Sequence, residues 1–164
     1  MPIHSAFFFC ASALLLGVVS GMRTMVAPAV LALTLSRRPE LVPPATPAHW
    51  FTLSAVAVPL GLAALGELIG DKLPQTPNRT ALAPFLARVA SGAICGAAMV
   101  QLGLMDKWLG AGFGAVGAAT GAIGMFHLRR YAGRVSRISD PYIGAIEDAL
   151  AIAIAATVLA LTLG

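Results

Sequence analysis

The stretch GELIGDKLP, residues 66–74, ends a long hydrophobic segment with two acidic residues. Residues 51–66 contain no charged side chain, so Glu67 lies at the end of a segment whose composition is that of a membrane span. Asp71 follows four positions later, which puts both carboxylates on one face of a helix. A carboxylate at the edge of a hydrocarbon layer needs a partner, water or a proton. We therefore take this stretch as the centre of the candidate site.

The composition of the whole chain is that of an integral membrane protein. Of the 164 residues, 58% are hydrophobic and 11% are charged, whereas an average soluble domain is about 25% charged. The mean hydropathy is +0.84. At roughly 20 residues per span, the length allows one domain of about four to six spans. The net charge of +4 comes mostly from loop residues, so membrane topology explains it better than nucleic-acid binding.

Five hydrophobic runs predict an all-α transmembrane bundle that forms a single domain over residues 1–164. The runs are about 6–35, 51–70, 81–104, 109–128 and 142–163. As one helix, the first run would be about 45 Å long, which exceeds a hydrocarbon core of about 30 Å. Pro28 would also leave the carbonyl of Thr24 without its helical donor. We therefore expect either a tilted, kinked helix or two half-helices broken within residues 21–28.

Basic residues in the loops predict the orientation in the membrane. In a five-span topology, loops 71–79 and 129–137 lie on one side and together hold six Lys or Arg residues. The other side holds three, Arg37, Arg38 and Lys107. The more basic side is expected to be cytoplasmic, in a bacterial inner membrane. A re-entrant first run would move the N-terminus to the other side and leave these two loops where they are.

Glycine pairs with GxxxG spacing predict close packing between helices, because backbone contact through small residues drives helix association in lipid. The pairs are Gly17/Gly21, Gly66/Gly70, Gly92/Gly96, Gly110/Gly114 and Gly117/Gly121. The run 109–128 is small on more than one face, so it lies either at the centre of the bundle or against a second copy in a homo-oligomer. Gly103 lies outside any such pair, and we expect it to tolerate a larger side chain better.

Seven charged residues within or next to the hydrophobic runs, together with the hydroxyl residue Thr24, form the candidate polar path or ligand-binding site. Its members are Arg23, Thr24, Glu67, Asp71, Arg79, Arg88, Glu147 and Asp148. Two RTxxAP elements, at 23–28 and 79–84, place a cation and a hydroxyl beside a carbonyl freed by proline. Half-helix ends of this kind bind ions in many transporters. The same charges could instead form ion pairs that only lock the helix ends together.

No motif for catalysis, metal binding or cofactor binding is found in the sequence. The three histidines, His4, His49 and His127, are dispersed, and Cys10 and Cys95 lie in separate apolar runs. None of these residues has the spacing of metal ligands. Nucleophile elbows and phosphate-binding loops are also missing from the sequence. We therefore expect no enzymatic activity, no cofactor and no metal site.

Four segments resemble, in order and over nearly the whole chain, a family of small bacterial and plant-type membrane proteins. They are GVVSGMRTMVAPA at 17–29, GELIGDKLPQTPNR at 66–79, RVASGAICGA at 88–97 and DPYIGAIEDALAIA at 140–153. The family is known as domain of unknown function 4126. The resemblance implies an integral membrane protein and carries no established activity. The chain departs from the family pattern after DKLP, where it has QTPNR and the family is expected to have an acidic residue.

These observations favour a small transporter or channel-like protein for an ion or a small charged solute. The Arg, Glu and Asp residues of the candidate site would then form its polar path. The alternative is a non-transporting membrane scaffold or interaction subunit that packs through its GxxxG faces. The expected partners are the lipid bilayer, the solute and a second copy of the chain. Glu67→Gln is expected to retain the fold and lose transport.

Overall fold

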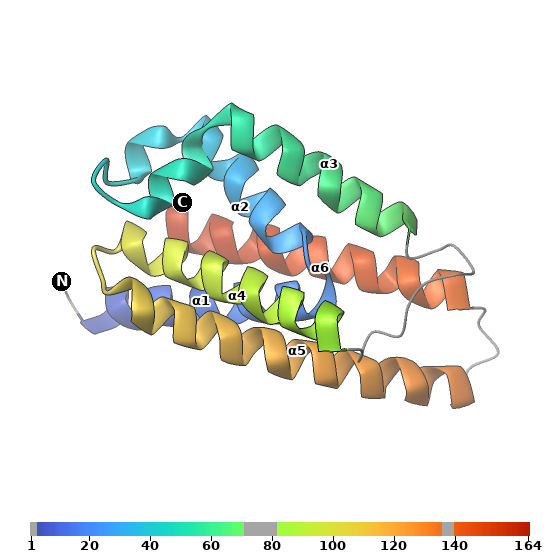
Figure 1. Ribbon diagram of the computed structural model, residues 1–164. Helices are drawn as coiled ribbons and strands as arrows, with labels where there is room; N and C mark the ends of the chain where they lie inside the picture. Colours follow the sequence, from blue (N-terminus) through green and yellow to red (C-terminus); the bar gives the residue numbers. More distant parts are fainter. Residues whose placement is uncertain (1–2, 71–81, 136–139) are drawn as a thin grey trace.

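The computed structural model describes residues 3–70, 82–135 and 140–164, which are helical with short connections and contain no strand (Figure 1). In these ranges, six α-helices and two 3-10 helices follow one another along the chain. They are α1 Ile3–Met22, α2 Val26–Arg37, η1 Pro39–Leu41, η2 Pro47–Thr52, α3 Ser54–Gly70, α4 Leu82–Leu102, α5 Lys107–Val135 and α6 Asp140–Leu163.

Three helices are long and apolar enough to cross a membrane, over Leu82–Leu102, Lys107–Tyr131 and Tyr142–Leu163. The helices α1, α2 and α3 are also apolar but present shorter hydrophobic stretches. Many large apolar side chains point outward; Phe7 is 69% exposed and Leu161 is 79% exposed. A soluble protein rarely exposes so much apolar surface, so these features identify an integral membrane protein.

The first hydrophobic run forms two helices, α1 and α2, which are separated by residues 23–25. Ser12 of α1 shares a hydrogen bond of 2.7 Å with Thr162 near the end of α6. At the end of α2, Arg38 donates a hydrogen bond of 3.1 Å to the carbonyl of Leu163. The middle of α1 and the end of α2 therefore both lie beside the end of α6, and Figure 1 shows that the chain reverses direction between α1 and α2.

Glycine brings the backbones of α1, α4 and α5 into contact. A Cβ on Gly17 would collide with the α5 backbone at Gly114, and one on Gly21 would collide with it at Ala118. On α4, a Cβ on Gly96 would lie 3.0 Å from the Cα of Gly114. Residue 114 thus meets both neighbouring helices, and α5 uses two of its faces for packing within the chain.

GxxxG spacing does not predict the packing of every glycine. A Cβ on Gly66 would meet no described atom within 4 Å, so this residue makes no close helix contact in that part of the chain. Gly103 is buried, and a Cβ there would lie 2.6 Å from the ring of Phe9. Gly103 is therefore not in open space, but a Cβ on Gly117 would collide with the backbone of α1, so the smaller effect expected at Gly103 stays a prediction. Gly112 and Gly124 of α5 have open space around them instead.

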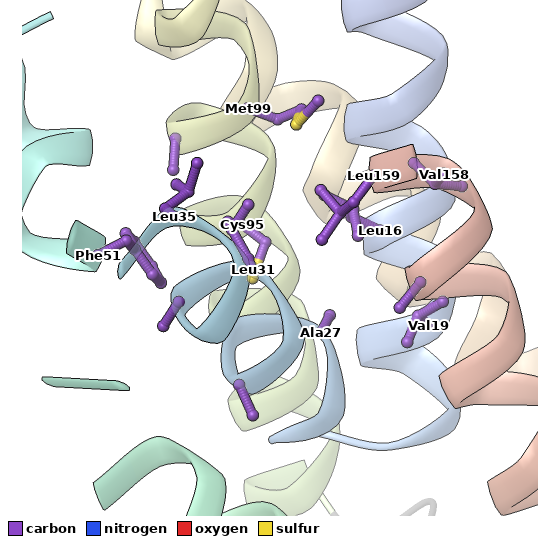
Figure 2. Packing of buried hydrophobic residues seen from close by; sticks show 14 of the residues in the cluster. Leu16, Val19, Ala27, Leu31, Leu35, Phe51, Cys95, Met99, Val158 and Leu159 are labelled. Carbon is purple, nitrogen blue, oxygen red and sulfur yellow. The ribbon is translucent and has the colours of Figure 1, made fainter. Parts of the chain in front are cut away.

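A hydrophobic core joins α1, α2, α4 and α6 (Figure 2). Leu16, Leu31, Leu35 and Met99 are fully buried in it, and Leu159 is 2% exposed. The core encloses most of α2, although this helix has only 12 residues. Burial of branched and long side chains on one short helix fixes its position against the three longer ones.

Helix α5 continues to Val135, well past the predicted end at residue 128. Arg129 and Arg130 were predicted in a loop but lie on this helix. Residues 129–135 contain no proline and one glycine, Gly133, so nothing in this segment stops the helix. The consequence is that Arg129 extends from a rigid element toward α6.

Candidate functional site

The turn between α1 and α2 is bound by a carboxylate from α3. The backbone N–H of Thr24 donates to Oε1 of Glu67 at 2.8 Å, and the N–H of Met25 donates to Oε2 at 2.7 Å. The first N–H groups of a helix have no partner inside the helix, and the helix dipole favours a negative charge there. Glu67 therefore binds the two amides that immediately precede α2, at the positive end of its dipole, and it does so from another helix.

A hydroxyl from α4 satisfies the carbonyl on the same turn. Pro28 lies in the first turn of α2 and has no N–H to offer to the oxygen of Thr24. Ser91 donates a hydrogen bond of 2.6 Å to this oxygen. The Oγ atoms of Ser91 and Ser20 are also 3.4 Å apart. The carbonyl that proline frees is thus bound inside the bundle rather than by solvent.

The side chain of Arg23, on the same turn, extends to α6 and is only 1% exposed. Its Nη2 atom is 2.5 Å from Oδ1 of Asp148 and 3.8 Å from Oε2 of Glu147. The same atom lies 3.5 Å from the carbonyl oxygen of Gly144. Both carboxylates are also buried. A buried charge persists only with such partners, so Arg23 links the turn to the first part of α6.

Arg129 of α5 adds a second cation to this cluster. Its Nη1 atom is 3.6 Å from Oε2 of Glu147, so Glu147 lies between two arginines. Arg129 was missed as a site residue, because the basic run was interpreted as a loop. The sequence signal that could have identified it is the continuation of helix-compatible residues through Val135.

Helix α3, which carries Glu67, is loosely attached to the rest of the molecule. Among its residues, only Ala57 and Ala64 are buried. Leu62 is 64% exposed and Ile69 is 67% exposed. In Figure 1, α3 lies at the edge of the bundle with α2 beside it. The carboxylate at the start of α2 is therefore held by a helix that buries little apolar surface of its own.

The model of a family described as Domain of unknown function (DUF4126) matches residues 10–163. The chain belongs to this family. The match includes the turn at residues 23–25 and its partners on α3, α4, α5 and α6, so the whole charged cluster lies within the DUF4126 domain. No curated protein and no solved structure matches the chain.

In this DUF4126 protein, five of the predicted site residues meet at the turn. They are Arg23, Thr24, Glu67, Glu147 and Asp148. Arg88 is buried on α4, three residues before Ser91, and therefore on the same side of that helix. Asp71 and Arg79 lie outside the described residues, as does the start of the second RTxxAP element.

The charged groups of the cluster form buried ion pairs and one contact between a carboxylate and backbone amides. Two arginines, Arg23 and Arg129, face two carboxylates of α6, while Glu67 faces backbone amides. Over the described ranges, no group of three or more His, Cys, Asp or Glu residues lies close enough to hold a metal ion. The cluster therefore places charged groups next to a helix break, enclosed by the surrounding helices.

Proposed function

We propose that this protein is a small membrane transporter or channel-like protein for an ion or a small charged solute. The observation that carries the proposal is the contact of Glu67 with the amides of Thr24 and Met25. It joins a break in a membrane helix to a carboxylate on the loosely packed helix α3. Broken helices with charged groups are tolerated in membranes where they are enclosed by protein or line a wet cavity, and transporters use them as solute sites.

The proposed topology treats α1 and α2 as one re-entrant pair. Helix α2, with 12 residues, is about 18 Å long, shorter than a hydrocarbon core of about 30 Å. The proposed spans are then α3, α4, α5 and α6 together with this hairpin. The charged cluster lies at the end of the bundle where α3 ends and α6 begins (Figure 1). The basic residues at the end of α5 and in the segment 71–79 that follows α3 make that end cytoplasmic in our proposal, in a bacterial inner membrane.

Movement of α3 would open and close the site in this mechanism. When Glu67 leaves the turn, the amides of Thr24 and Met25 lose their acceptor and become available to water or a solute. Arg23 and its partners lie on the same turn, so they would face the opening. The closed arrangement described above and such an open one would be the two states that a solute selects between.

Flux through liposomes tests this proposal. The full chain is reconstituted, and dyes report the movement of H⁺, K⁺ and Cl⁻ under imposed gradients. The parent should exceed protein-free liposomes for at least one ion, and Glu67→Gln should change that flux. Glu40→Gln, which alters an exposed carboxylate in η1, is the matched control and should behave as the parent does. Equal flux with and without protein, for all three ions, would contradict an ion path.

A scaffold that assembles through α5 is the second candidate. The GxxxG glycines of α1 and α4 are used within the chain, so they offer no face to a partner. Gly112 and Gly124 of α5 have no described atom within 4 Å of a Cβ, and this outer face is the one that a second copy would use. Cysteine at Gly124 should then crosslink two copies under mild oxidation. A monomer that gives no crosslink would remove this candidate.

A further inference from the structure

An open apolar groove of about 370 Å³ lies between α2 and α3. Residues 26–33 of α2 form one wall and residues 57–68 of α3 form the other. The lining residues include Leu33, Ala57, Gly61, Leu65 and Leu68. Several side chains along it have no protein cover; Leu62 is 64% exposed and Leu65 is 56% exposed. In a membrane protein, such a groove opens toward hydrocarbon.

The length of the groove matches that of a lipid acyl chain. Its wall on α3 runs from Ala57 to Leu68, about 16 Å along the helix axis. The acyl chains of one leaflet fill half of a hydrocarbon core of about 30 Å, or about 15 Å. An acyl chain that lies along α3 from the Ala57 end is therefore long enough to reach the end beside Glu67.

A cation lies at the other end of the groove. Leu33 lines the groove, and Arg37 follows four residues later on the same face of α2, where the helix ends. Arg37 is exposed. Trp50 of η2, the element that leads into α3, is 66% exposed, and tryptophan favours the level of the lipid headgroups. The groove thus combines an apolar channel with a positive charge at the membrane surface.

We propose that this groove binds an anionic membrane phospholipid. One acyl chain lies between α2 and α3, and the phosphate pairs with Arg37. The charge at the groove mouth is what selects the phospholipid, because a cation at the membrane surface attracts anionic headgroups. The chain packs against Leu65 and Leu68, which flank Glu67, so the bound lipid supports the loosely packed helix that carries this carboxylate.

Filling the groove tests the proposal directly. A Cβ on Gly61 would have Leu33 as its nearest neighbour at 3.9 Å, so Gly61→Leu can occupy the groove without striking backbone. Gly124→Leu is the matched control, on open surface of α5. Native mass spectrometry counts phosphatidylglycerol on the purified full chain. The parent and Gly124→Leu should retain a bound lipid, and Gly61→Leu should lose most of it. Equal retention by both variants would overturn the proposal.

Arg37→Gln tests the headgroup contact, and it decides the matter if Gly61→Leu does not fold. Arg37 is exposed, so its loss should leave the bundle intact. One basic residue near a membrane surface changes the affinity for anionic lipid by about fivefold. We expect this drop for phosphatidylglycerol and no change for phosphatidylcholine. Unchanged binding of phosphatidylglycerol would refute the pairing with Arg37 and thus the proposed site.

Discussion

The two sides of the bundle are packed in different ways. On one side, α1, α4 and α5 touch through glycine, so closely that Gly114 has no room for a side chain. On the other, α3 buries two alanines and leaves a groove against α2. In lipid, close packing decides how firmly helices associate. The glycine side is therefore the rigid frame, and the α3 side is where a second conformation costs least.

The charged turn at residues 23–25 connects these two sides. Ser91 and Arg23 tie it to α4 and α6, where buried groups surround it. Glu67 ties it to α3, where the surroundings are open. The same turn thus has buried partners on α4 and α6 and one partner on the loosely packed helix α3. This difference is why the proposed function assigns the moving part to α3.

The largest expected effect is at the centre of the glycine side. Gly114→Leu should prevent assembly of the bundle, because the added side chain would collide with the α4 backbone at Gly92 and Gly96. Gly112→Leu, two residues away on open surface, should change the free energy of unfolding by no more than about 0.5 kcal/mol. Size-exclusion profiles and thermal unfolding in detergent measure both. A well-folded Gly114→Leu protein would show that this contact is not tight.

The next effect concerns the buried ion pair between Arg23 and Asp148. Asp148→Asn removes the negative charge beside the buried Arg23. Loss of one partner of a buried pair lowers the free energy of unfolding by about 3–5 kcal/mol. We expect the lower end of this range, since the amide oxygen still accepts a hydrogen bond. Chemical denaturation in detergent measures it, with Glu40→Gln as the exposed control. A loss no larger than in the control would mean that the pair does not hold the turn.

A smaller loss is expected for the partner on α3. In Glu67→Gln, one oxygen can still accept an N–H, but the amide nitrogen faces the other N–H and cannot. The cost should be about 1–3 kcal/mol, so the fold survives. Hydrogen exchange at Thr24 and Met25 should accelerate while exchange in α5 stays unchanged. Slow exchange at this turn in the variant would show that Glu67 does not bind its amides.

Much of the architecture could be predicted from local patterns. The apolar runs identify helices, and the run 51–70 corresponds closely to α3, Ser54–Gly70. Pro28 and the length of the first run predict a break within residues 21–28, and the structure has the chain turn at residues 23–25. Glu67, Arg23, Glu147 and Asp148 attract attention because a charge within an apolar segment is costly. Hydrophobic runs, prolines and charges inside apolar segments are properties of short stretches of chain, so they can be read from the sequence alone.

The partners of those charges were decided by the tertiary structure. The sequence pairs Glu67 with Asp71 by helical spacing, whereas the structure directs its two oxygens to amides 42 and 43 residues away. Arg129 joins Glu147 because α5 continues past its expected end. Spacing along one helix says which residues share a face. Which face meets another helix depends on the direction and rotation of both, and here the reversal at residues 23–25 sets them.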